Sequence, residues 1–204
     1  MTSTPYAGNA QKRSITREDI LPLEVYARER KALRQNLVVK KKHRRLEVGP
    51  VATFYFENYE TMWAQVHEML FIEKGGEEQI PDELRAYNSL IPQGRELVAT
   101  VMFEIVPPLR RKTFLSRLGG VEEAMFLEID GRRLMGKAEE DLDRTNAEGK
   151  ASSVHFIHFP LDEAAATAFK APNHRVILGI EHAGYSHMAV MPEAVRAALA
   201  EDLD

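Results

Sequence analysis

Histidines near the C-terminal end of the chain have the type and spacing that could do chemistry. His155 falls in a run of aromatic and β-branched residues, 153–159, and His182 follows a second such run, 174–181. Both runs predict strands, and neighbouring strands would let His155 and His182 approach each other. Two imidazoles with a carboxylate form a known ligand set for non-haem iron and other divalent metals. The candidate third ligands are Glu104 and Glu128.

Two other interpretations of these histidines remain open. Buried histidines are often held by hydrogen bonds alone and bind nothing. Alternatively, His155 and His182 could join Tyr185, which lies just beyond the second run, in a polar pocket for a small molecule. Ligands drawn from separate strands leave no local sequence signature, so spacing does not distinguish a metal centre, a pocket and structural histidines.

The usual catalytic motifs are missing from the chain. It contains no cysteine, which excludes disulfides, thiolate nucleophiles and cysteine-ligated iron–sulfur clusters. It also has no GxG, P-loop or GxSxG sequence. His67 and Glu68 resemble the start of a zinc-protease motif, but Phe71 stands where the second histidine would be, so His67 is expected to be an ordinary helix residue. These absences favour a protein without catalytic activity of its own.

A basic segment near the N-terminus could bind a partner. Residues 1–46 carry 12 Lys or Arg and 4 Asp or Glu, although the whole chain has a formal net charge of −4. The run 40–45 is expected to close a helix, where cations complement the negative end of the helix dipole. Arg44 and Arg45 are candidate binding residues within it. The alternatives are that this segment folds back on the acidic remainder or contacts nucleic acid, and the nucleic-acid contact is the weaker of the two.

A second candidate docking segment is the loop around Tyr87 and Asn88. It mixes aromatic, amide and apolar groups, and binding residues are often concentrated in loops. The structural alternative is that Tyr87 pins the loop while Asn88 caps the preceding helix.

Length and composition predict one globular domain. The chain has 204 residues, of which 44% are hydrophobic and 28% are charged, close to the average for folded proteins. No apolar run is long enough to span a membrane, and the start of the chain lacks the apolar stretch of a secretory peptide. We therefore expect a cytoplasmic protein, with a flexible tail at residues 1–14 and a single domain at 15–204.

The pattern of apolar residues and turn signals predicts alternating helices and strands. Helices are expected at residues 21–43, 58–74, 81–88, 109–118, 162–170 and 192–203. A strand that includes residue 48 is expected before the turn at 49–50. Further strands are expected at 51–57, 96–106, 125–129, 132–137, 153–159 and 174–181, with an acidic loop at 139–149. Asp130 and Gly131 give a strong hairpin signal. The expected class is α+β, a mainly antiparallel sheet of about seven strands that could curl toward a barrel, with flanking helices.

Several short motifs appear in an order that resembles a bacterial family of unknown function, DUF3501. The resemblance extends over residues 15–203 and depends on the motifs taken together. They are ITREDILPL at 15–23, FEN at 56–58, EML at 68–70, AYN at 86–88 and SVHF at 153–156.

The resemblance implies a role in a redox system, because genes of this family often neighbour those of a rubrerythrin-like protein and an iron–sulfur oxidoreductase. It carries no catalytic residues with it, and it implies glutamine in relatives at the position of His67. The leading hypothesis is therefore an accessory protein that docks on such a redox partner, which would supply the iron or cluster. The alternative is a metal- or small-molecule-dependent enzyme with its site at His155, His182 and Tyr185.

Overall fold

A computed structural model describes residues 12–139 and 150–204 of the chain. Residues 140–149 of the predicted acidic loop and most of the predicted N-terminal tail therefore lie outside the described residues. The helices are α1 (Leu23–Lys41), α2 (Tyr59–Glu73), α3 (Ile80–Asn88), α4 (Pro108–Leu115), α5 (Glu163–Lys170) and α6 (Glu193–Ala200). The strands are β1 (Arg45–Val48), β2 (Ala52–Glu57), β3 (Glu96–Phe103), β4 (Met125–Ile129), β5 (Arg132–Met135), β6 (Lys137–Ala138), β7 (Val154–Pro160), β8 (Val176–His182) and β9 (Tyr185–Val190).

The strands form two sheets. Sheet A has the order β1-β2-β3-β7-β6, and sheet B has the order β5-β4-β8-β9. Every pairing between the described strands is antiparallel, which confirms the α+β class. The described chain has two more strands than the seven expected, β6 and β9, and its two sheets do not close into a barrel.

The main hydrophobic core lies between the two sheets. Alternation along β3 gives the face that the sequence predicts, because Leu97, Ala99, Val101 and Phe103 are all buried in this core. The opposite face of sheet A carries the polar and half-buried side chains of the same strands. These alternate positions form the floor of the candidate site.

The segment expected as one strand at 132–137 is divided at Gly136. On one side of this residue β5 pairs with β4 in sheet B, and on the other β6 pairs with β7 in sheet A. A Cβ atom at Gly136 would lie 2.5 Å from Cγ2 of Ile157, so only glycine lets the chain pass this closely between the sheets.

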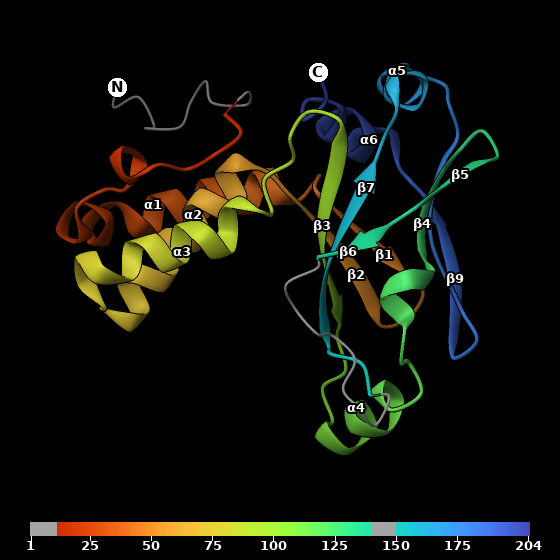
Figure 1. Ribbon diagram of the computed structural model, residues 1–204, viewed down its shortest axis with the longest axis horizontal. Coiled ribbons are helices and arrows are strands. Elements are labelled where there is room, and N and C mark those ends of the chain that lie inside the picture. Colours follow the sequence, from red (N-terminus) through yellow and green to blue (C-terminus); the bar gives the residue numbers. More distant parts are fainter. Residues whose placement is uncertain (1–11, 140–149) are drawn as a thin grey trace.

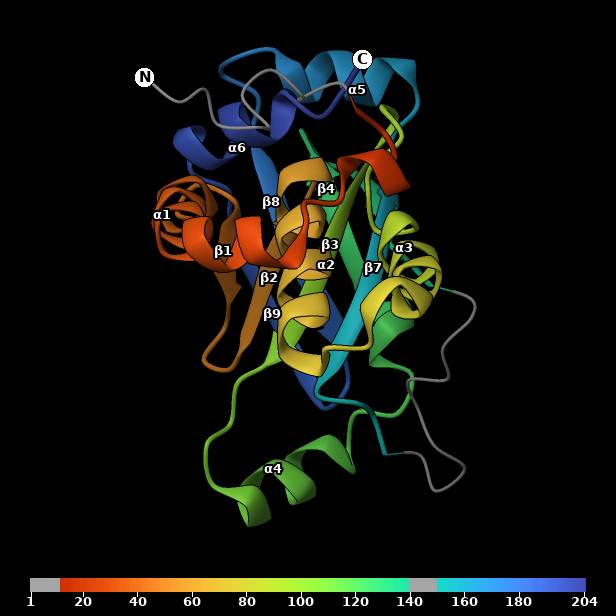
Figure 2. The ribbon, with the colours of Figure 1, turned by 90° about the vertical axis from the view of Figure 1, so that its left-hand side faces the viewer.

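Helices α1, α2 and α3 form a layer on the outer side of sheet A, whereas α5 and α6 cover one end of the sheets and α4 lies at the other (Figure 1, Figure 2). The helical layer has its own hydrophobic cluster, which includes Tyr26, Trp63, Val66 and Leu90. Val98 of β3 belongs to this cluster and so joins the helices to the sheet.

The junction between β2 and α2 is fixed by a reciprocal cap. Asn58 Oδ1 accepts a 3.0 Å hydrogen bond from the Thr61 backbone, and Thr61 Oγ1 accepts a 2.9 Å bond from the Asn58 backbone. The cap turns the chain from strand to helix directly after Glu57. This places the Glu57 side chain in the angle between sheet A and α2.

Among the residues that the structure describes, no helix has both the length and the apolar character needed to cross a membrane.

Candidate functional site

A cavity of about 340 Å³ lies between the outer face of sheet A and the helical layer. Its floor consists of alternate residues from three adjacent strands of the sheet: Tyr55, Glu57, Thr100, Met102, Val154 and Phe156. Its other walls are Met62 and Gln65 of α2, Tyr87 of α3, Leu90 and the last residue of α1, Lys41. We call it the Glu57 cavity. A second hollow of about 400 Å³ adjoins it and shares Tyr87, Leu90 and Phe156.

The strand register brings the floor residues together. Tyr55 lies opposite Thr100, and Thr100 lies opposite Phe156, so one row of side chains crosses β2, β3 and β7. Directly opposed residues in antiparallel strands share a face. Glu57 is two residues beyond Tyr55 on β2 and therefore also faces the helices.

Glu57 is the most unusual polar group of the cavity. The residue is only 5% exposed, and its Oε1 atom accepts a 2.7 Å hydrogen bond from Thr100 Oγ1. Its Oε2 atom is buried without a hydrogen-bond partner, and no ion pair involves Glu57 in the part of the chain that the structure describes. Buried polar groups are normally satisfied, because burying one without a partner costs free energy. An unpaired carboxylate oxygen at the floor of a cavity therefore points to a ligand.

The helical side of the cavity combines apolar and polar groups. Gln65 Nε2 donates a 3.5 Å hydrogen bond to the Tyr87 hydroxyl. Burial raises the pKa of Tyr87, so this phenol stays neutral at physiological pH and keeps its own proton to donate. Lys41 is the cation of the described lining.

A hydrogen-bonded cluster continues the polar face of sheet A beyond the cavity. Tyr55 donates a 2.9 Å hydrogen bond to Glu104 Oε1, and Thr53 donates a 2.8 Å bond to Oε2 of the same carboxylate. Burial, together with the hydrogen bond to Glu104, raises the pKa of Tyr55. Both oxygens of Glu104, a candidate metal ligand in the sequence, are thus occupied by hydroxyl groups.

The two candidate metal ligands, His155 and His182, lie in different sheets. His155 belongs to β7 in sheet A, and His182 ends β8 in sheet B, so the neighbouring strands that the metal hypothesis required are not found. In the described part of the chain, no group of three His, Asp or Glu side chains is arranged to hold a metal ion. The other candidate third ligand, Glu128, has Arg133 at 3.8 Å.

Both histidines make local contacts. His155 is fully buried; its Nε2 atom lies 2.9 Å from the Ser152 carbonyl oxygen, and its Nδ1 atom lies 3.8 Å from a carboxylate oxygen of Glu122. His182 Nε2 lies 3.1 Å from the Gly119 carbonyl oxygen. The structure therefore supplies a hydrogen-bonding role for each ring where it stands.

Tyr185 holds the two sheets together. Its buried hydroxyl donates a 2.7 Å hydrogen bond to the Val48 carbonyl oxygen and accepts 3.2 Å bonds from the Val51 and Ala52 backbone amides. The side chain thus attaches β9 of sheet B to the β1–β2 turn of sheet A. Sequence reasoning placed no strand at β9, so this contact was not expected.

Arg44 is a buried residue and not part of an exposed basic surface. It is 7% exposed, forms an ion pair with Asp202, and donates 3.2 and 3.1 Å hydrogen bonds to the carbonyl oxygens of Phe56 and Glu57. It therefore supports the backbone of the residue at the cavity floor. Arg45 is exposed, and it stands opposite Tyr55 in the register of β1 and β2.

The two candidates of the 87–88 segment have different positions. Tyr87 lines the Glu57 cavity, whereas the Asn88 side chain makes 2.7 and 2.9 Å hydrogen bonds with the Ile15 amide and carbonyl groups. Asn88 thereby attaches the N-terminal segment to the end of α3. Of the sequence candidates, Tyr87 is the one that the structure brings into the cavity lining.

A smaller cavity of about 260 Å³ lies between η1 (Arg17–Asp19), the start of α1 and η2 (Gly76–Gln79). Its most buried polar side chain is His67, whose Nε2 atom accepts a 3.0 Å hydrogen bond from the Leu21 amide. The other ring nitrogen lies 2.8 Å from the Trp63 carbonyl oxygen. Both nitrogens are thus satisfied, and His67 leaves no buried polar atom for a ligand in this cavity.

Comparison with known proteins identifies relatives but no activity. A family model described as a protein of unknown function, DUF3501, matches residues 14–203. The crystal structure of a protein of unknown function from Burkholderia pseudomallei K96243 has a TM-score of 0.87 and 36% sequence identity, and the match covers 94% of this chain and 100% of that chain. No curated protein matches this chain.

Proposed function

Because this chain belongs to the DUF3501 family, whose function is unknown, we propose a function from its site: it binds a small molecule in the Glu57 cavity. Ligand sites typically have volumes of about 300–1,000 Å³, apolar walls and a few polar groups that orient the ligand. The 340 Å³ cavity, with its Met, Leu, Val and aromatic walls, has this character.

The observation that carries the proposal is the unpaired Oε2 atom of Glu57. A hydrophobic side chain at this position would extend the apolar surface of Phe156 and Val154 and would avoid burying a carboxylate oxygen without a partner. A residue that lowers the stability of the fold, for example by burying an unsatisfied polar atom, is often found at a ligand site. We therefore infer that the carboxylate serves binding and not folding.

A cavity-blocking substitution tests this proposal. Val154 of β7 lies on the floor, so Val154→Phe should fill the cavity, whereas Val190→Phe makes the same change on an exposed position of β9 in the other sheet. We expect ligand-observed NMR with a fragment library to find fragments that bind the wild type and Val190→Phe but not Val154→Phe. If no fragment distinguishes the two variants, the cavity is not a binding site.

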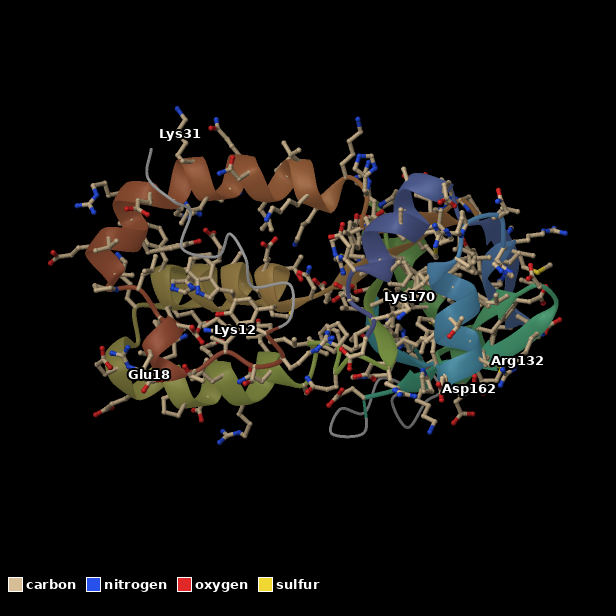
Figure 3. The ribbon with its side chains drawn as sticks, turned by 90° about the horizontal axis from the view of Figure 1, so that it is seen from above. Lys12, Glu18, Lys31, Arg132, Asp162 and Lys170 are labelled. Carbon is tan, nitrogen blue, oxygen red and sulfur yellow. The ribbon has the colours of Figure 1, made fainter. Side chains whose placement is uncertain are left out.

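A second candidate function is an accessory protein that docks on an iron–sulfur oxidoreductase or a rubrerythrin-like protein. The observation that favours docking is the outer face of α1, where Val38 and Val39 are 70% and 69% exposed beside basic residues. Lys31 points away from the body of the protein on the same helix (Figure 3). Exposed apolar side chains among lysines suit a partner surface that is apolar with an acidic rim.

Crosslinking in a cell extract tests the docking role. The expected result is that the wild type recovers an iron–sulfur oxidoreductase or a rubrerythrin-like protein and that Val38→Asp/Val39→Asp does not. Val190→Asp, at an exposed position of strand β9, is the matched control. Recovery of neither redox protein by the wild type would count against this function and would leave the small-molecule proposal untouched.

A further inference from the structure

We propose that the Glu57 cavity selects a cation, specifically an amine with an aromatic or otherwise apolar body. This inference rests on the proposed binding function and specifies the ligand class of the same site. The evidence for this ligand class is the set of hydrogen-bonding groups on the cavity floor that have no partner within the described residues.

The sheet side of the cavity offers acceptors without a free donor. The Thr100 hydroxyl proton is committed to Glu57 Oε1, and the Tyr55 hydroxyl proton is committed to Glu104. The remaining group is Oε2 of Glu57, which can only accept as a carboxylate. A ligand that reaches this floor must therefore bring a hydrogen-bond donor.

The Glu57 carboxylate forms no ion pair among the described residues, and this favours a charged donor over a neutral one. Asp202 is paired with Arg44 and Glu68 with Arg30, whereas no ion pair is found for Glu57 among the described residues. A buried carboxylate without a counter-ion is unfavourable unless the missing charge arrives with a partner. An ammonium group supplies both the charge and the N–H donors.

The walls define the rest of the ligand. Phe156, Tyr55 and Tyr87 present aromatic surface around the carboxylate, and Met62 and Met102 add polarizable thioethers. Aromatic faces also attract cations, so an ammonium group near these rings is favoured further. A flat apolar body next to the amine suits such walls.

Lys41 distinguishes a cationic ligand from an anionic one. Its ammonium group repels a cationic ligand and attracts an anionic one, so its effect has the opposite sign to that of Glu57. If the ligand is an amine, removing the Lys41 charge should leave its affinity unchanged or raise it. If the ligand is an anion, the same change should weaken binding.

Three probes of nearly one shape test the inference: 2-phenylethylamine, 2-phenylethanol and 3-phenylpropanoate. Their affinities for the full chain are measured by ligand-observed NMR titration at pH 7 and constant ionic strength. We expect the amine to bind at least about tenfold more tightly than either of the other probes, as a buried charge pair requires. Equal or tighter binding of the alcohol or the carboxylate would overturn the inference.

Variants assign the effect to the carboxylate. Glu57→Gln keeps an acceptor for Thr100 and should weaken amine binding at least about tenfold while leaving the alcohol unchanged. Lys41→Gln should not weaken amine binding. An equal loss for all three probes in Glu57→Gln would contradict charge recognition. If Glu57→Gln fails to fold, as thermal unfolding would show, the probe series on the wild type still decides the question.

The failure of this inference is distinguishable from failure of the proposed function. Fragments that bind wild type but not Val154→Phe, without preference for amines, would overturn the cation inference and retain a binding site. An absence of any cavity-dependent binding, in the probes and in the library, would overturn both.

Discussion

The hydroxyl of Thr100 donates a 2.7 Å hydrogen bond to Oε1 of Glu57, across the pairing of β3 with β2. This bond fixes the carboxylate against the sheet and leaves Oε2 without a partner among the described residues. The pair thus resembles a pre-oriented acceptor, because one oxygen is held by the protein and the other remains for a ligand.

If this polar pair serves binding, it can be removed without loss of stability. We expect Glu57→Met/Thr100→Val to unfold in urea with a free energy equal to or higher than that of the wild type, because the buried carboxylate and its half-buried hydroxyl partner are both replaced by apolar groups of similar size. Thr100→Val alone should lower the free energy of unfolding by about 1–3 kcal/mol, since it leaves the whole carboxylate unsatisfied. A double variant that is less stable than Thr100→Val would show that Glu57 is needed for folding.

The fold was largely predictable because its elements have strong local patterns. The alternation at Leu97, Ala99, Val101 and Phe103 is confirmed as the buried face of β3, and the hairpin at Asp130 and Gly131 joins β4 to β5. The division of a strand at Gly136 was not predictable, because the reason for it is a distant contact with Ile157. Strand β9 was missed for a similar reason, since its four central residues are exposed or half-buried and show no regular alternation.

The candidate site was mostly beyond sequence reasoning. Glu57 and Thr100 are 43 residues apart, and their contact depends on strand register and not on spacing. One signal was present in β2, where Thr53, Tyr55 and Glu57 alternate with apolar residues and mark a polar face. The imidazole chemistry of His155 and His182 made them metal-ligand candidates in the sequence, but the structure places them in separate sheets.

The buried ion pair of Arg44 and Asp202 gives a prediction about stability. Desolvation raises the pKa of Asp202, although Arg44 opposes this effect. Arg44→Met should lower the free energy of unfolding by about 3–5 kcal/mol, because it leaves a buried carboxyl group without its cation. Arg44→Met/Asp202→Leu should recover much of this loss in urea unfolding. A single variant as stable as the wild type would contradict a structural role for Arg44.

The two tyrosine hydroxyls should separate structural and binding roles. Tyr185→Phe should lower the free energy of unfolding by about 1–3 kcal/mol, because it removes three hydrogen bonds to the buried β1–β2 turn. Tyr87→Phe loses one 3.5 Å contact with Gln65 and should change stability by less than about 0.5 kcal/mol. Thermal and urea unfolding compare the two variants directly, and equal losses would contradict this assignment.

The buried ring of His67 predicts a stability that falls in acid. Burial lowers the pKa of His67 from 6.5 to about 4. Between these values the unfolded chain binds more protons, so the folded state is fully stabilised above pH 6.5 and loses this contribution as the pH falls toward 4. In urea, the free energy of unfolding of the wild type should be lower at pH 5 than at pH 7. This difference should be smaller in His67→Gln. An unchanged loss in the variant would exclude His67 as its source.

His158 predicts the opposite dependence at higher pH. Its Nδ1 atom lies 3.0 Å from Glu96 and its Nε2 atom lies 2.7 Å from Glu139, so the ring joins β3 to the residue that follows β6. Burial alone would lower the pKa of His158, but hydrogen bonds to the two carboxylates raise it above 6.5. The imidazolium bridge is therefore complete below pH 6.5, and its contribution to stability is lost as the pH rises through the raised pKa.

Urea unfolding between pH 6 and pH 9 measures the contribution of His158. The free energy of unfolding of the wild type should fall across this range, and His158→Gln should abolish the fall that belongs to this bridge. Glu96 has the opposite pH dependence, and only in acid. Burial would raise the pKa of Glu96, but the hydrogen bond from His158 lowers it below the ordinary value. The stabilisation by the Glu96 carboxylate is therefore lost only when the pH falls below the ordinary carboxyl range. His43→Gln, at an exposed position, is the matched control and should keep the wild-type slope. A charged ring between two carboxylates must lose its attraction to them when it loses its proton. If the free energy of unfolding depended on pH equally in His158→Gln and His43→Gln, the bridge would therefore not stabilise the fold.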